Sequence, residues 1–414
     1  MDYEQKVRHC KSILKTKMKK FIFLLFLLPF LSNAQSFYET DFNQFLDDYK
    51  QYFGYLEEQN INIESIRSYY KNELKSIKSK DEFISFMEIV INEFHNGHIS
   101  LNTNISSSNN IIPSGADIYA EKIGEQYFIS DLRKDFPAEL SGLEKGMEIL
   151  KFNDQDIKLA IKKFLPKSVT KYNEKMYQYA LNMLLAGARN SDRKITILDK
   201  GKRIDFFPDE TNVKKNDEFL ELKKINSDIG YIKINNTLGN SELIPAFDKA
   251  LDSLFQLKTI ILDLSETPSG GNTMVARGIM GRFIDQEFPY QIHLFNEKPY
   301  NTVRKWIELA SPRGKTYTGN LIVMVGHWTG SMGEGMAIGF DAMKRGDIVG
   351  TKMAGLIGAI YILNMPNTNL GYSIPTEKMY HINGTPRENF KPPYFTKSIE
   401  ETFQKAIELS NIKR

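Results

Sequence analysis

The spacing of hydrophobic and polar residues changes twice along the chain. Between residues 35 and 100, apolar residues recur at helical spacing, as in FNQFLDDYKQYFGYL, and Ser79 in SKDEF is suited to begin a helix. Residues 111–165 contain short apolar runs separated by turn residues, which is typical of strands. Within residues 166–414, apolar strands alternate with amphipathic helices from residue 229 onward. The sequence therefore predicts an N-terminal helical domain, a β-rich domain and an open α/β layer.

Two polar segments directly follow apolar strands of the predicted α/β layer. SETPSGGN follows TIILDL, and HWTGS follows NLIVMVG. Active groups gather at the carboxyl ends of strands in such layers. Ser331 begins the next helix, where a serine is most often only an N-cap, but the positive helix end and the flanking glycines also suit a nucleophile. The glycine pair Gly270 and Gly271, with the N–H of Met332, would then supply donors for an oxyanion.

A serine nucleophile needs a base, because its hydroxyl group is weakly nucleophilic at neutral pH. His98 is one candidate, and His327, four residues before Ser331, is a rival that more simply ends its strand. His95 and His98 are three residues apart, as metal ligands can be, but no cluster of carboxylates or cysteines supplies further ligands. We therefore predict neither a metal site nor a cofactor.

The first 34 residues have the layout of a secretory signal peptide. Two lysines after Met18 precede an apolar run from Phe21 to Leu31, which is too short to span a membrane, and SNA follows. We expect cleavage after Ala34, with an uncleaved anchor as the alternative, and Met18 is an alternative to Met1 as the start. The mature chain is predicted to be periplasmic or secreted, with no stable membrane span.

Removal of residues 1–34 changes the formal charge from +3 to −2, because seven lysines and arginines leave with two acidic residues. A nearly neutral chain without a basic run argues against nucleic acid as a partner. The only cysteine, Cys10, precedes the apolar run, so the mature chain would carry no thiol or disulfide.

The segment YFISDLRKDFPAELSGLEKGMEILKFNDQDI resembles part of a PDZ domain. The matching positions are Pro137, Ala138, Gly142, Leu143, Gly146, Ile149 and Leu150. PDZ domains bind an extended peptide as an added strand on a sheet edge, often by its C-terminal carboxylate. The resemblance implies a peptide-binding module over residues 111–165. The alternative is a β-rich domain with no ligand.

Five short motifs occur in the order found in the tail-specific, or C-terminal processing, serine peptidases and their tricorn-like branch. FHNGHIS ends the helical region, and DLSETPSGGN, TGSMGE, GTKMAG and ENFKPPY follow the PDZ-like segment. The order is more diagnostic than any one motif, and the resemblance extends from about Phe37 to the end of the chain. It implies a ClpP/crotonase-like α/β peptidase core over residues 166–414.

The resemblance also assigns roles to residues. It makes Ser331 the nucleophile, with the backbone N–H groups of Gly270, Gly271 and Met332 as oxyanion donors. DLSETPSGG is one residue longer than the family pattern and lacks its arginine, which leaves open which of the two glycines donates.

The base is assigned through the tricorn-like branch. The main branch uses a lysine at the position of Leu356, so that base is absent, and Lys352 lies four residues short. The tricorn-like branch uses a histidine and a glutamate, which correspond to His98 and Glu388. A histidine accepts a proton near pH 7 without a large pKa shift. Two motifs differ, since Asn96 replaces aspartate and ENFKPPY lacks a glycine and an aspartate.

Three functional hypotheses follow. The leading one is an exported serine endopeptidase that hydrolyses unstructured peptides or protein tails through an acyl-enzyme on Ser331. The alternative is a catalytically inactive relative that binds peptides or partner proteins through the PDZ-like domain, which the loss of lysine at Leu356 favours. The third is a hydrolase of a non-peptide ester or amide. The expected partners are peptides or unfolded proteins, and oligomerisation stays open.

Overall fold

The structure, a computed structural model, describes residues 37–211 and 217–412. The predicted signal peptide, its cleavage site after Ala34 and Cys10 lie outside the described residues. Among the helices in the described ranges, none has the length and apolar character that a membrane crossing needs.

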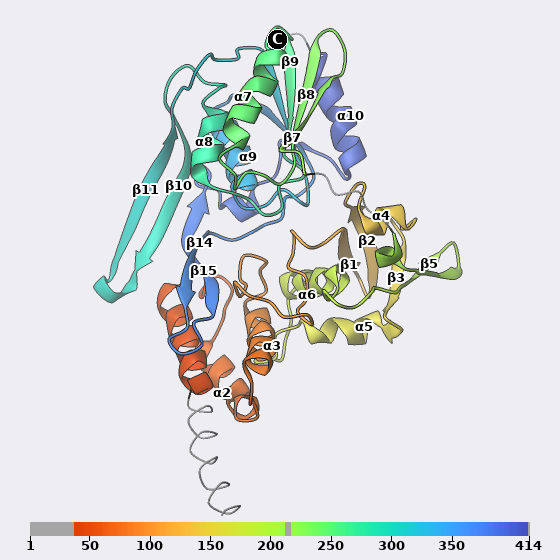
Figure 1. Cartoon of the computed structure of the whole chain (residues 1–414), viewed down its shortest axis with the longest axis vertical. Coiled ribbons are helices and arrows are strands. Elements are labelled where there is room, and N and C mark those ends of the chain that lie inside the picture. The colour runs from red at the N-terminus through yellow and green to blue at the C-terminus, as the bar shows by residue number, and fades with distance from the viewer. Residues whose placement is uncertain (1–36, 212–216, 413–414) are drawn as a thin grey trace, which may run out of the picture.

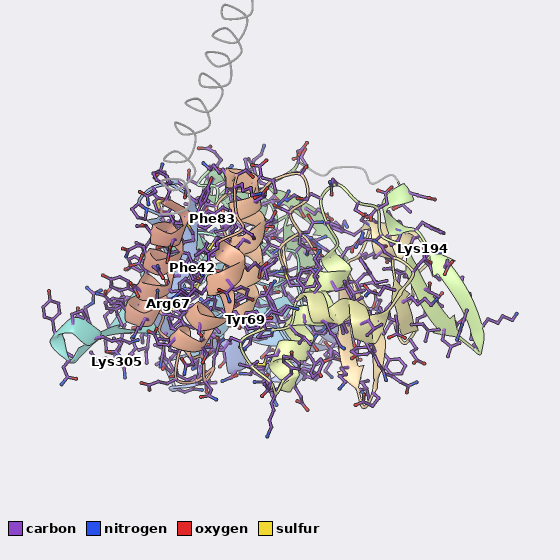
Figure 2. The ribbon with its side chains drawn as sticks, turned by 90° about the horizontal axis from the view of Figure 1, so that it is seen from below. Phe42, Arg67, Tyr69, Phe83, Lys194 and Lys305 are labelled. Carbon is purple, nitrogen blue, oxygen red and sulfur yellow. The ribbon has the colours of Figure 1, made fainter. Side chains whose placement is uncertain are left out.

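The N-terminal region is helical, as its apolar spacing predicts. Its elements are a helix over residues 37–52, α2 (Ile63–Leu74), α3 (Lys80–Ile91) and the 3₁₀ helix η1 (Asn92–Phe94). Ser79 caps α3 by accepting a hydrogen bond from the N–H of Glu82, as SKDEF predicts. Phe42 and Phe83 are buried in the helical core, whereas Tyr69 is exposed (Figure 2).

The following β-rich unit extends past the expected boundary at residue 165. Its elements are β1 (Ile118–Ile123), β2 (Gln126–Leu132), α4 (Pro137–Leu140), β3 (Glu148–Phe152), β4 (Gln155–Asp156), α5 (Ile157–Ala160), η2 (Ile161–Lys163), α6 (Glu174–Ala186), β5 (Ile195–Asp199), β6 (Lys202–Phe206) and η3 (Pro208–Glu210). The sheet order is β1-β2-β3-β5-β6, with antiparallel neighbours. Ile195 and Ile197 of β5 pack in one hydrophobic cluster with Ile129 and Ile149. The sheet therefore includes residues that we had assigned to the peptidase core.

Helix α6 occupies the edge of this sheet at β1. The N–H of Ala120 donates to Oδ1 of Asn182 at 3.0 Å. The carbonyl oxygen of Ala120 accepts from Nδ2 of Asn182 at 3.1 Å and from Nε2 of Gln178 at 2.6 Å. A peptide added to this edge would compete for these groups, because strand addition uses the same main-chain donors and acceptors.

Replacing Asn182 with alanine is expected to lower the free energy of unfolding by about 1–3 kcal/mol, because the buried N–H of Ala120 loses its acceptor while the carbonyl oxygen keeps only Gln178. Calorimetric unfolding measures this change. Asn72→Ala on the exposed face of α2 is the matched control, and it is expected to leave the transition unchanged. Equal transitions for Asn182→Ala and wild type would show that the edge contacts contribute nothing.

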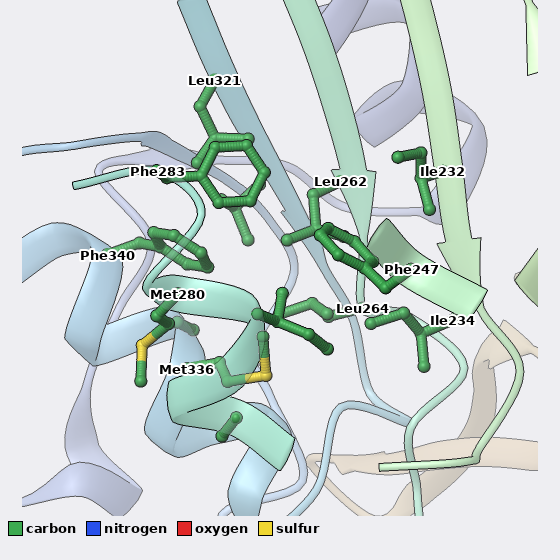
Figure 3. Close-up of a cluster of buried hydrophobic side chains, with 14 of the residues drawn as sticks. Ile232, Ile234, Phe247, Leu262, Leu264, Met280, Phe283, Leu321, Met336 and Phe340 are labelled. Carbon is green, nitrogen blue, oxygen red and sulfur yellow. The ribbon is translucent and has the colours of Figure 1, made fainter. Parts of the chain in front are cut away.

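The α/β layer predicted from the alternating pattern is confirmed. Its elements are β7 (Leu220–Lys224), β8 (Ile229–Ile234), α7 (Leu243–Ser253), β9 (Thr259–Asp263), α8 (Thr273–Met280), β12 (Asn320–Val325), α9 (Met332–Ala342), β13 (Asp347–Gly350), β16 (Tyr394–Phe395) and α10 (Ile399–Ser410). The sheet order is β16-β13-β12-β9-β8-β7, and only the pair β7–β8 is antiparallel among the described strands. Helices α7, α8 and α9 cover one face, where Phe247, Phe283 and Phe340 are buried (Figure 3). Helix α10 covers the other face through Ala406 and Leu409.

A second sheet, which the sequence pattern did not predict, joins the layer to the N-terminal helices (Figure 1). Its elements are β10 (Phe288–Glu297), η4 (Lys298–Tyr300), β11 (Thr302–Ala310), β14 (Ala359–Asn364) and β15 (Gly371–Tyr380), in the order β11-β10-β15-β14. Tyr372 and Ile374 of β15 pack in the helical core, and the hydroxyl of Tyr49 donates to the carbonyl of Ser373. Ser373 Oγ also donates to the carbonyl of His98 at 2.8 Å. These contacts bring the FHNGHIS segment next to the C-terminal half of the chain.

Candidate active site

The loops that follow β9 and β12 lie side by side, as their place at adjacent strand ends predicts. The N–H of Thr267 donates to the carbonyl of Trp328, and the N–H of Gly330 donates to the carbonyl of Thr267. Thr329 Oγ1 donates to the carbonyl of Leu264 at 2.9 Å. The SETPSGG and HWTGS segments therefore form one hydrogen-bonded unit at the edge of the sheet.

Ser331 occupies a strained turn between β12 and α9. Its backbone has φ 51° and ψ −109°, a conformation that residues other than glycine rarely adopt. A sharp strand-to-helix turn of this kind exposes the nucleophile in other hydrolases. Gly270 lies against it, because a Cβ atom at Gly270 would stand 2.4 Å from Ser331 Cβ. Only glycine permits this approach of the two loops.

The three predicted oxyanion donors differ in their hydrogen bonding. The N–H of Gly270 donates to the carbonyl of Thr267 at 3.0 Å. Within the described part of the chain, no acceptor bonds the N–H groups of Gly271 and Met332. Of the three predicted oxyanion donors, the N–H groups of Gly271 and Met332 are therefore the two without an acceptor in the described residues.

His98 is held by a backbone carbonyl. Its Nδ1 lies 2.8 Å from the oxygen of Ile357. Because a carbonyl oxygen only accepts, Nδ1 carries the proton and Nε2 is the basic nitrogen. Burial, followed by the positive charge of Arg387, lowers the pKa of His98 to about 4. The imidazole is neutral at pH 7, which is the form that a general base needs.

The side chain of Leu356 contacts both the loop of Ser331 and the loop of His98. The δ carbons of Leu356 lie 3.2 Å from the positions that a Cβ atom would take at Gly97 and at Gly330. Leu356 therefore packs between the residues that precede His98 and Ser331. No hydrogen bond joins His98 to Ser331 in the described residues. Such bonds are often long in an empty site and shorten when substrate binds.

Glu334 connects Ser331 to the Leu356 segment, a role that the sequence did not indicate. Its Oε2 accepts from the N–H of Ser331 at 2.8 Å and of Leu356 at 3.3 Å, and its Oε1 accepts from the N–H of Gly355 at 2.9 Å. Burial raises the pKa of Glu334 to about 7, against the lowering effects of Arg387 and these N–H groups. The signal for this role in the sequence is the glutamate of TGSMGE, which lies three residues after Ser331.

Arg387 and Asn96 bind the other side of the same segment. Arg387 Nη2 donates to the carbonyl oxygens of Leu356 and Gly358, each at 2.9 Å. Asn96 Nδ2 donates to the carbonyl of Gly355 at 3.3 Å. We call residues 355–358 the connecting segment, because side chains next to Ser331 and His98 both bind it.

Glu388 lies next to this network but outside its hydrogen bonds. Its Oε2 is buried without a hydrogen-bond partner among the described residues, and burial raises the pKa of its carboxyl group. Its carbonyl oxygen lies 3.9 Å from the Cβ position at Gly355. The atom that binds the ring of His98 is the Ile357 oxygen, and no hydrogen bond joins Glu388 to His98 among the described residues.

The remaining candidate bases and ligands lie elsewhere. The His327 ring stacks on Tyr119, with centroids 3.7 Å apart, and burial lowers the pKa of His327 to about 3. His95 Nδ1 lies 3.2 Å from the carbonyl of Glu93. Lys352 is exposed. In the residues that the structure describes, no three histidine, cysteine or acidic side chains are placed to share a metal ion.

Replacing Glu334 with glutamine is expected to lower kcat/KM by on the order of 10²-fold, mainly through kcat, because small misplacements of reacting groups have effects of this size. An amide nitrogen only donates, so glutamine cannot accept the three N–H bonds at both of its polar atoms. Steady-state kinetics on a fluorogenic peptide measures the change. Exposed Glu144→Gln is the control, and wild-type kcat in Glu334→Gln would exclude the positioning role.

The model of peptidase family S41 matches residues 228–393, a range that contains Ser331 and Glu388. Mature CPAF complexed with lactacystin is 12% identical, with a TM-score of 0.62, and the match covers 91% of this chain and 97% of that chain. The photosystem II D1 C-terminal processing protease is 13% identical, with a TM-score of 0.54 and coverages of 88% and 93%. At sequence identities this low, the structural similarity shows a shared fold alone. No curated protein matches the sequence.

Proposed function

We propose that this chain, whose residues 228–393 match the model of peptidase family S41, is a serine-type peptidase that hydrolyses unstructured peptides or protein tails through an acyl-enzyme on Ser331. His98 is the base of this proposal. The observation that carries it is the connecting segment, which Glu334 joins to the N–H of Ser331 and His98 binds through Ile357.

The proposed reaction has two steps. Ser331 Oγ attacks the peptide carbonyl while its proton passes to Nε2 of His98, and the N–H groups of Gly271 and Met332 bind the oxyanion. The C–N bond breaks as His98 returns the proton to the leaving amine. Water then attacks the acyl-enzyme by the same route and releases the new carboxylate. Glu388 is the third residue of the proposed site, and its backbone carbonyl oxygen lies 3.9 Å from the Cβ position at Gly355 of the connecting segment.

The layout of residues 1–34 supports the further proposal that the enzyme acts after export. Mass spectrometry of the protein recovered from the periplasm or medium of an expressing bacterium tests this. The expected N-terminus is Gln35, and recovery of the uncleaved chain from the cytoplasm alone would refute export.

The alternative of a non-hydrolytic peptide-binding relative has weaker support. The β1 edge, where a PDZ domain would accept a peptide strand, already bonds to Asn182 and Gln178. Leu356, which stands where the main branch has its lysine base, favours inactivity. Neutral His98 can act as the base in place of that lysine.

Digestion of casein, an unstructured protein, tests the proposed function. Mass spectrometry should find new peptide termini with wild-type enzyme and with Ser311→Ala, a change at an exposed serine on another loop. Ser331→Ala should produce none. Equal digestion by Ser331→Ala would place the chemistry elsewhere.

A further inference from the structure

A cavity of about 380 Å³ lies between the β-rich unit and the face of the α/β sheet that α10 covers. The segment after β2 forms one side, and the ends of β9, β12 and β13 and the first turns of α10 form the others. Its lining residues, all in the described ranges, include neither Ser331 nor His98 nor Gly270. The cavity therefore does not include these three residues of the candidate active site, although Ser265, Glu266, His327 and Trp328 of the same two loops line it.

Most charged groups that line the cavity are already paired. Arg133 Nε donates to Glu266 at 2.8 Å. Lys223 and Lys233 both contact Glu221 outside the cavity. Asp263 accepts from the hydroxyl of Tyr231 at 2.6 Å and from the N–H of Ser265 at 2.7 Å. These groups need no ligand to satisfy them.

Asp131 and His327, which also line the cavity, have incomplete sets of hydrogen-bond partners. The side chains of Asp131 and His327 are only 7% and 9% exposed. Asp131 Oδ1 accepts from the N–H of Leu132, whereas Oδ2 stands 3.8 Å from Nε2 of His327, too far for a hydrogen bond. His327 Nδ1 has no partner among the described residues. Burial accordingly raises the pKa of Asp131 to about 7 and lowers that of His327 to about 3.

We propose that this cavity binds an alkylammonium or alkylguanidinium group, with Asp131 as its counter-ion. A buried carboxylate with one hydrogen bond is costly, and a cation removes that cost. His327 accepts a second hydrogen bond from the same cation through Nε2 when its proton is on Nδ1.

The walls suit the rest of such a ligand. Tyr231, Phe403 and Trp328 supply aromatic surface, and Met324 and Ile399 supply aliphatic surface for the alkyl chain. Glu400 adds a second negative charge to the lining and acts on Asp131.

Nearby lysines do not fill the site. Lys145 and Lys352, whose charges act on His327, are absent from the lining residues in the described part of the chain. Lys145 Nζ is bound by the carbonyl of Lys397. Lys134 lines the cavity but is exposed, so it lies at the rim.

The test uses fluorescence of Trp328 in the variant Trp306→Phe, because the chain has only two tryptophans. Titrations at pH 8.5, above the pKa of Asp131, compare hexylamine, agmatine and the uncharged hexan-1-ol. We expect saturable signals from both cations and none from the alcohol. The same titrations on a Ser331→Ala background separate binding from hydrolysis, so failure of one proposal leaves the other standing.

Asp131→Asn keeps the shape of the side chain and removes its charge. We expect it to raise the dissociation constant of hexylamine at least about tenfold, because hydrogen bonds to charged groups are the stronger ones. Exposed Glu400→Gln should raise it about twofold to threefold. The matched control, exposed Asp285→Asn, should leave it unchanged. Equal binding by Asp131→Asn and wild type, or equal binding of hexan-1-ol and hexylamine, would overturn the proposal.

A blocked peptide with one central lysine distinguishes two sources of the cation. Binding of the peptide as well as hexylamine assigns the cavity to a basic side chain of a polypeptide. Binding of hexylamine alone assigns it to a small free amine. Both results support a cation site. If neither the peptide nor hexylamine binds, the cavity is not a cation site.

Discussion

Replacing Ser331 with alanine is expected to lower kcat/KM for peptide hydrolysis by at least about 10³-fold, because removal of a nucleophile leaves only binding and oxyanion stabilisation. The fold should be unaffected, since Glu334 bonds to the backbone N–H of Ser331 rather than to its hydroxyl. Hydrolysis of a fluorogenic peptide measures the loss, and circular dichroism checks the fold.

Ser311→Ala is the control for this change, because Ser311 is exposed and contacts Glu287 on the protein surface. It is expected to retain wild-type kcat/KM. Retention of activity in purified Ser331→Ala, with wild-type enzyme excluded by mass, would contradict the assignment of the nucleophile.

Replacing His98 with alanine should lower kcat/KM by about 10²–10⁴-fold, the usual contribution of a general base. Nε2 is the proton acceptor in our account, because Nδ1 donates to the carbonyl of Ile357. His327→Ala, which removes the rival base, should leave kcat near the wild-type value. The opposite order of effects would assign the base to His327.

The pH profile gives a second test of His98. Its pKa is lowered to about 4, so its base form is complete above about pH 5 and the kcat/KM limb that it sets falls as pH drops through about 4. The free energy of unfolding also depends on the titration of His98. Because the pKa of His98 in the folded protein lies below its ordinary value of 6.5, the unfolded chain binds more protons between pH 6.5 and about pH 4. The contribution of His98 to stability is therefore present above about pH 6.5 and lost as pH falls to about 4. His98→Gln should lose less stability than wild type between pH 7 and pH 5 in thermal unfolding.

The local sequence pattern predicted the α/β layer and its loops, because these elements are determined by residues that are close in the sequence. Apolar strands followed by polar turns placed Ser331 and the glycine pair at adjacent strand ends, and the structure joins these loops through Thr267. Ser79 begins α3 where its capping sequence indicates. These features need only the local sequence and the tendency of parallel strands to end at one edge.

Contacts between distant segments could not be predicted in this way. Glu334 bonds to residues about twenty positions later, and Asn96 to a residue more than 250 positions later. Neither spacing leaves a periodic signal in one sequence. The second sheet was missed because β10 and β15 pair across more than 80 residues, and the β-rich unit was cut short because β5 pairs with β3 across α6.

Labelling with a fluorophosphonate, read by intact mass, tests the central claim most directly, because the probe reacts with an activated serine and needs no known substrate. Our account predicts one added probe on residues 35–414 of the wild type, none on Ser331→Ala and much slower labelling of His98→Ala. A folded wild-type protein that stays unlabelled between pH 6 and 9, or a Ser331→Ala variant that is labelled, would contradict it.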